Sequence, residues 1–175
     1  MIQLSSDTYL RPLSAEDTPL IFNEIIANRE YLREWLPFVD FTQEVEDTEA
    51  FVTSTLESGE KQFVIYHHEQ FVGLIGFTRT DAANKRTEIG YWLAEAAQGN
   101  GIVTKAVVEL LHLAFGQLDF NRVQIRVAVA NTKSRNIPEK LGFCFEGIER
   151  DGELLVDNTF TDLAIYSMLK KEFGG

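Results

Sequence analysis

Seven residues near the middle of the chain have the composition and the setting of an anion-binding loop. They read Gln98-Gly99-Asn100-Gly101-Ile102-Val103-Thr104, and they separate a strand-like stretch (residues 86–93) from a helical one that begins at Ile102. Free N–H groups at a helix N-terminus, with the positive end of the helix dipole behind them, favour a bound phosphate. Glycines let the backbone approach such a group closely. The loop therefore predicts a phosphate site that needs no basic side chain.

Two common phosphate-binding sequences do not occur in the chain. The P-loop requires Gly-Lys followed by Ser or Thr, and the sequence has no such run. The dinucleotide fingerprint requires a third glycine at the position that Thr104 occupies. From the loop alone, the remaining alternative is a plain glycine turn that starts a helix.

Composition and charge narrow the possible ligands. The chain has 175 residues, of which 45% are apolar and 25% charged, and this predicts one ordinary globular domain, residues 1–175. A net charge of −11 argues against nucleic acid, which needs a basic face, and suits a cationic acceptor such as an amine, although solubility alone explains it equally well. A single cysteine and the lack of a signal peptide or of a long apolar run predict a cytoplasmic protein without a membrane segment.

The periodicity of apolar residues predicts alternating strands and helices. The expected strands are residues 8–13, 62–66, 71–78, 86–93, 122–129, 143–147 and 158–169. The expected helices are residues 14–26, 28–36, 44–56, 102–118 and 131–141. This order predicts an α/β fold with a central mixed sheet of about seven strands. The segment 149–157 is expected to be an acidic loop between the last two strands.

No metal site is expected from the sequence. His67 and His68 are adjacent, and successive residues of a regular strand point to opposite faces, so they could not hold one ion from a strand. We expect them to be solvated turn residues. Cys144 lies between two phenylalanines in an expected strand, and we expect no nucleophilic role for it.

Several segments occur in the order and spacing of a known family. They are Ile89-Gly-Tyr-Trp-Leu93, the loop 98–104, Asn121-Arg-Val123, Asn131-x-x-Ser134 and Glu139-Lys-Leu-Gly-Phe143. Together they resemble the RimJ/RimL-type branch of the GNAT N-acetyltransferase superfamily, which includes ribosomal-protein N-terminal acetyltransferases. The resemblance covers nearly the whole chain. The family's loop pattern is Gln/Arg-x-x-Gly-x-Gly/Ala, and the chain departs from it at Val103, where a small residue is usual.

The resemblance implies a site for acetyl-CoA as co-substrate, and no metal. It implies a mostly antiparallel GNAT sheet with helices on both faces and one parallel strand pair that splays apart, so that the pantetheine arm pairs with the strand backbone. The residues implied to bind acetyl-CoA are Tyr91, Trp92, Leu93, Gln98, Gly99, Asn100, Gly101, Ile102, Val103, Thr104, Asn131 and Ser134. Asn131 could equally be only the N-cap of the helix that follows.

Direct transfer to an amine needs a base for the amine and a hydrogen-bond donor for the departing thiol. Glu88 is the first candidate base and Glu153 the second, with a plain surface carboxylate as the alternative for Glu88. Many GNAT enzymes use a tyrosine as acid at the position where this chain has Pro138, and the branch offers Ser134 in its place. The oxyanion donor is expected to be a backbone N–H of residues 91–93.

The expected activity is acetyl transfer to a primary amine, with the N-terminal α-amine of a ribosomal protein as the first choice. A small amine, such as a polyamine or an antibiotic, is one alternative acceptor. A second alternative is an acyl-CoA-binding module without catalysis, which the missing tyrosine alone suggests. Relatives of this type are often dimers, so a homodimer is possible, but no spacing in the sequence indicates one.

Overall fold

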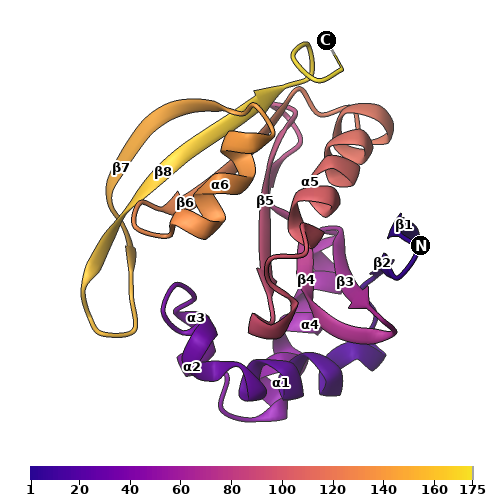
Figure 1. Ribbon diagram of the computed structural model, residues 1–175, viewed down its shortest axis with the longest axis vertical. Coiled ribbons are helices and arrows are strands. Elements are labelled where there is room, and N and C mark those ends of the chain that lie inside the picture. Colours follow the sequence, from indigo (N-terminus) through magenta and orange to yellow (C-terminus); the bar gives the residue numbers. More distant parts are fainter. Residues whose placement is uncertain (175) are drawn as a thin grey trace.

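One sheet of eight strands forms the centre of the molecule. The computed structural model describes residues 1–174 (Figure 1). The strands are β1 (Ile2–Ser5), β2 (Thr8–Pro12), β3 (Gln62–His67), β4 (Gln70–Asp81), β5 (Arg86–Leu93), β6 (Arg122–Ala128), β7 (Cys144–Leu154) and β8 (Phe160–Leu169). The helices are η1 (Ala15–Asp17), α1 (Thr18–Ala27), α2 (Arg29–Leu32), α3 (Phe38–Phe41), α4 (Val45–Ser58), η2 (Glu95–Ala97), α5 (Ile102–His112), η3 (Leu113–Gln117) and α6 (Thr132–Lys140).

The strand order is β1-β2-β3-β4-β5-β6-β8-β7, and only β5 and β6 run parallel. The predicted α/β fold with a mixed, mostly antiparallel sheet is therefore confirmed. The sheet has one strand more than the seven expected, because residues 2–5 pair with β2 as an edge strand. These residues are too few and too polar at Gln3 and Ser5 for their periodicity to reveal a strand.

Helices cover both faces of the sheet, as the family resemblance implies. Along β3, Ile65 packs in the cluster with α5 and α6, while Val64 packs in the cluster with α1 to α4. Successive strand residues point to opposite faces, so a sheet that is covered on both sides needs apolar residues at consecutive positions. β4 shows this most clearly, because residues 71–77 are all buried.

The parallel pair β5–β6 is short and then parts. Pairing joins Arg86 to Arg122, Thr87 to Val123 and Glu88 to Gln124, and it goes no further. β5 nevertheless remains paired with β4 as far as Leu93, and β6 remains paired with β8 as far as Ala128. The sheet therefore opens in its middle, between two strands that are each held from their outer side. The splay that the resemblance implies is present.

Three predicted boundaries were wrong. The helix expected over 28–36 is α-helical only in α2, Arg29–Leu32. The helix expected over 102–118 is α-helical only to His112 and continues as the π-helical segment η3. The segment 149–157, expected to be an acidic loop, belongs to β7 as far as Leu154 and pairs with β8. Figure 1 shows β7 and β8 as a long hairpin that extends to one side. Both sides of β7 are largely exposed, so its sequence needs no alternation of apolar and polar residues. A strand of this kind, rich in charged residues, cannot be recognised from periodicity.

No helix within residues 1–174 is both long enough and apolar enough to cross a membrane.

The contact between Gly73 and β5 gives a test of how the opening is held. A Cβ at Gly73 would lie 2.2 Å from the carbonyl oxygen of Trp92 and 3.0 Å from Cα of Leu93. We expect Gly73→Ala to lower the free energy of unfolding by about 1–3 kcal/mol, because the backbone of β5 must shift. Gly90→Ala is the matched control on β5, since its Cβ would meet only Thr78 at 3.7 Å. Urea denaturation of both variants measures the two free energies of unfolding. Equal losses for Gly73→Ala and Gly90→Ala would contradict the role given to the close contact between Gly73 and β5.

Candidate active site

A cavity of about 590 Å³ occupies the opening between β5 and β6. Its walls come from the α2 region, both parted strands, the start of α6 and the β7 hairpin. All three predicted catalytic residues, Glu88, Ser134 and Glu153, line this one cavity. Of the predicted cofactor residues, those that line it are Tyr91, Trp92, Leu93, Gln98, Val103, Asn131 and Ser134. The segments around Glu88, Ser134 and Glu153, which are far apart in the chain, therefore meet where β5 and β6 part.

The loop that precedes α5 carries a row of free backbone donors. Outside helix α5 itself, the N–H groups of residues 99–104 have no acceptor among the described residues. Gly99 and Gly101 have φ angles of 80° and 68°, which favour glycine, and a Cβ at either would meet nothing within 4 Å. The side-chain amide of Gln98 donates to the carbonyl oxygen of Leu93 at 3.1 Å and fixes the loop to the end of β5. This arrangement leaves an open cradle of donors that fits a phosphate.

Not every predicted loop residue faces the cavity. Gly99, Asn100, Gly101, Ile102 and Thr104 lie outside its lining, on the helix-start side. Asn100 donates its amide to the carbonyl oxygen of Ala97 at 3.1 Å, so its side chain holds the loop shape. Ile102 is buried in the core beneath the loop. These positions can therefore offer a ligand only their backbone N–H groups, and Thr104 in addition a half-buried hydroxyl.

Ser134 is held by two partners at the start of α6. Its hydroxyl lies 2.9 Å from the hydroxyl of Tyr91, and its backbone N–H donates to the side-chain oxygen of Asn131 at 3.3 Å. Asn131 is thus the N-cap of α6, as its spacing permits. Burial raises the pKa of Tyr91 to about 12, so its hydroxyl keeps its proton at neutral pH. The pair Tyr91–Ser134 is an uncharged donor group that spans the gap from β5 to α6.

Glu88 is already engaged by cations. Its carboxylate accepts from Nε of Arg126 at 2.9 Å, and both side chains are about 15% exposed or less. Arg126 also contacts Glu149 at 3.3 Å. Burial raises the pKa of Glu88 above its usual range, an effect that the positive charges of Arg126 and Arg79 oppose. Glu88 therefore holds Arg126 in place and is less free to take a proton than the sequence suggested.

Glu153 is the freer carboxylate. It lies on β7 opposite Thr161 and not in a loop, and its side chain has no hydrogen-bond partner among the described residues. Burial raises its pKa, the charge of Glu88 adds to the rise, and Arg126 and Arg79 oppose it. A carboxyl with a raised pKa and an open lone pair is the better proton acceptor near neutral pH. Glu153 was the second of the two predicted bases, and which of the two acts stays a prediction.

Several lining residues were not predicted for the site. Arg79 and Arg126 balance the carboxylates, and alternation along β6 places Arg126 on the face opposite its buried valines, a signal that the sequence does contain. Lys133 lies with its ammonium 5.8 Å from the ring centre of Tyr31, so α6 meets the α2 region at the mouth of the cavity. Contact between these two segments could not be read from one sequence.

Trp92 contributes to the site in a restricted way. Its indole packs edge-on against Phe71, with ring centres 5.9 Å apart, in the cluster formed with α1 to α4. Its side chain therefore belongs to the core, although Trp92 also lines the cavity.

Other candidates lie away from this cavity. Cys144 is exposed and is not part of the lining. His67 and His68 line a second hollow. His68 lies in the turn after β3, as expected, with a φ angle of 49°, whereas His67 is the last residue of β3, so the argument from a regular strand does not apply to the pair.

Comparison with known proteins agrees with this geometry. Residues 7–144 match the family described as Acetyltransferase (GNAT) domain. The chain is 34% identical to the "Putative ribosomal N-acetyltransferase YdaF" of Bacillus subtilis, over 95% of this chain and 93% of that protein. It is 29% identical to the ribosomal-protein-serine acetyltransferase of Escherichia coli K12, over 96% of each chain. The structure of microcin C7 self immunity acetyltransferase MccE in complex with acetyl-CoA and AMP superimposes with a TM-score of 0.86, at 25% identity over 95% of this chain and 94% of that one.

Arg126 pairs with Glu88, whose side chain is only 14% exposed, and this predicts that the stability lost on removing Arg126 depends on pH. Because the pKa of Glu88 is raised in the folded state, folding binds protons, and stability falls as pH rises above the unfolded value near 4.5. We expect Arg126→Gln to cost about 2–3 kcal/mol of unfolding free energy at pH 7, where the carboxylate is left charged, and clearly less at pH 4. Urea denaturation at both pH values measures the difference.

Arg86→Gln is the control for this prediction. Arg86 lies on β5, the strand that carries Glu88, is 58% exposed and pairs with Asp81 at 3.3 Å, so its loss is expected to cost little at either pH. A cost for Arg126→Gln that is the same at pH 4 and pH 7 would contradict the account of the carboxylates.

Proposed function

This chain belongs to the GNAT acetyltransferase family and is an acetyl-CoA-dependent N-acetyltransferase, and we propose that its acceptor is the N-terminal α-amine of a ribosomal protein. One observation carries the proposal: Glu88, Glu153 and Ser134 line a single cavity that opens between the parted strands β5 and β6. The two curated relatives described above are named for ribosomal acetylation and match the chain over nearly all of its length.

The free donors before α5 fit the pyrophosphate of CoA. Hydrogen bonds to a charged group contribute roughly 1.5–3 kcal/mol each, so three or four backbone N–H groups from residues 99–104 suffice without a basic side chain. The unpaired inner edge of β5, residues 91–93, then faces the pantetheine arm, whose amides need backbone partners. Bound acetyl-CoA supplies the acetyl thioester for the transfer.

The acceptor must lose a proton before it can attack. A protein α-amine with a pKa near 7.8 is roughly 15% neutral at pH 7, so deprotonation costs only about 1 kcal/mol. A lysine amine with a pKa near 10.4 would cost about 4.6 kcal/mol. A single carboxylate base therefore meets the requirement of an α-amine more readily than that of a lysine amine. We assign this role to Glu153, acting directly or through water.

Ser134 is assigned as the hydrogen-bond donor to the leaving thiol. A serine hydroxyl is a weak acid, but Tyr91 lies within hydrogen-bond distance and can donate to Ser134 Oγ while the serine proton points into the cavity. The oxyanion partner is assigned to a backbone N–H of residues 91–93. In this arrangement the base lies on the β7 side of the cavity and the donor on the α6 side.

The acceptor is tested by thiol release from acetyl-CoA with a defined panel. The panel holds peptides with different N-terminal residues, the same peptides with blocked N-termini and an internal lysine, spermidine and an aminoglycoside. We expect release with one class of free N-terminal peptide and at least 100-fold less with its blocked form, because the lysine is far less often neutral. Turnover of spermidine or the aminoglycoside alone would overturn the proposed acceptor in favour of a small amine.

Removal of the Ser134 hydroxyl should affect turnover more than binding. We expect Ser134→Ala to lower kcat about 10- to 100-fold with CoA affinity unchanged within about threefold, since the hydroxyl acts on the leaving group and not on the pyrophosphate. Steady-state kinetics and calorimetry measure the two quantities. Ser58→Ala, at the end of α4, is the control and should behave like the parent. An unchanged kcat for Ser134→Ala would remove this residue from the mechanism.

A further inference from the structure

The turn between β3 and β4 carries two histidines in an unusual backbone conformation. His67 pairs with Gln70 as the last rung of the hairpin, and the two residues between them, His68 and Glu69, have φ angles of 49° and 60°. Two left-handed residues in a two-residue turn define the type I′ form, which normally selects Asn and Gly. Because His68 has left the regular strand, strand alternation no longer separates it from His67. The centres of the two imidazole rings lie 4.1 Å apart.

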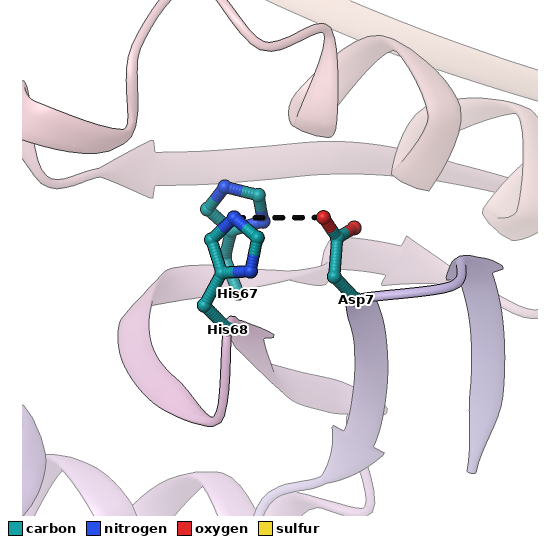
Figure 2. A group of neighbouring side chains, drawn as sticks. All are labelled: Asp7, His67 and His68. Carbon is teal, nitrogen blue, oxygen red and sulfur yellow. Dashed lines mark ion pairs between the residues drawn. The ribbon is translucent and has the colours of Figure 1, made fainter.

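A carboxylate from another turn completes the group. Asp7 lies between β1 and β2, and its carbonyl oxygen accepts from the N–H of His68 at 2.8 Å. Its Oδ2 lies 3.5 Å from Nε2 of His68 (Figure 2). Ligand atoms of Asp7, His67 and His68 all lie within 4.8 Å of one another. Two turns that are about sixty residues apart in the chain are thus joined at one point.

Neighbouring hydroxyls hold these side chains in a particular orientation. Oδ1 of Asp7 accepts from Ser5 Oγ at 2.6 Å and from Thr8 Oγ1 at 3.0 Å, which leaves Oδ2 directed at His68. Thr8 is buried, and its Oγ1 also lies 2.8 Å from Nδ1 of His67. The threonine hydroxyl donates to Asp7, so its oxygen accepts a hydrogen bond from the Nδ1–H of His67. That assignment leaves Nε2 of His67 without a proton and free to bind a cation.

We propose that Asp7, His67 and His68 form a surface site for one divalent transition-metal ion of the zinc type. Two imidazoles and one carboxylate are donors that suit Zn²⁺ and its neighbours, whereas Mg²⁺ and Ca²⁺ prefer oxygen alone. A tetrahedral zinc site needs ligand atoms about 3.3 Å apart. The side chains of His68 and Asp7 are 67% and 38% exposed, so they have room to close onto an ion, and water takes the fourth position.

The net charge of −11 favours the approach of cations to the protein as a whole. An ion here would tie the β1–β2 turn to the β3–β4 turn and would bind only the folded chain, so it should stabilise the protein. The site does not depend on the proposed acceptor, because none of its three residues lines the cavity between β5 and β6.

The test uses the full chain without an affinity tag, titrated with Zn²⁺ in a calorimeter and with Co²⁺ by absorption spectroscopy. We expect one equivalent to bind and the melting temperature to rise with metal concentration. Asp7→Asn, His67→Gln and His68→Gln should each weaken binding at least 10-fold. His68 is exposed in a turn, so its variant is expected to fold even if His67→Gln does not.

His112→Gln is the matched control, because it removes the third histidine of the chain. His112 lies at the end of α5 and packs against Phe173. This variant should bind Zn²⁺ like the parent. The proposal is overturned if no saturable Zn²⁺ binding is found up to about 100 μM, a concentration on the order of the weakest dissociation constant that would matter. It is also overturned if His68→Gln and His112→Gln bind Zn²⁺ equally well.

Discussion

The parting of β5 and β6 after three residue pairs is the constraint on which the rest of the structure depends. Elsewhere in the sheet, neighbouring strands form hydrogen bonds with each other. Beyond Glu88 and Gln124, the facing edges of β5 and β6 have no partner strand. Unpaired backbone groups inside a protein are costly unless a ligand or water reaches them. The fold tolerates the gap because β4 and β8 hold the two strands from outside, and because the gap is a cavity that admits a ligand. In the proposed function, the opening is where the acetyl donor lies.

The two sides of this opening carry different groups, and in the proposed function these groups have different roles. On the β7 side, Glu88 and Glu153 share the cations Arg79 and Arg126, and burial raises the pKa of both carboxyls. On the α6 side the donor group is a neutral hydroxyl pair. A proton acceptor on one side and a proton donor on the other suit an amine that arrives protonated and a thiol that leaves.

The sequence predicted the fold class, the helix faces and the three chain segments that meet at the cavity, because apolar periodicity and glycine placement are local signals. It missed β1 and the length of β7, where exposed edge strands carry no alternation. It placed Glu153 in a loop, although the residue lies on β7 opposite Thr161, and it did not indicate that Arg126 on β6 is the partner of Glu88. It expected His67 and His68 to be turn residues, which holds for His68, but it did not indicate the left-handed backbone that brings the two rings together. Each miss depends on tertiary contact or on backbone conformation that side-chain pattern does not encode.

The central claim is that backbone N–H groups of residues 99–104 hold the pyrophosphate of CoA without a basic side chain. The most direct measurement is a ¹H–¹⁵N correlation titration of the labelled protein with CoA, and in parallel with pantetheine, which lacks the pyrophosphate. The account predicts large downfield amide shifts for Gly99 to Thr104 with CoA and none there with pantetheine, while residues 91–93 respond to both ligands. Loop amides that stay in place at saturating CoA, with the main shifts at arginine or lysine side chains, would contradict it.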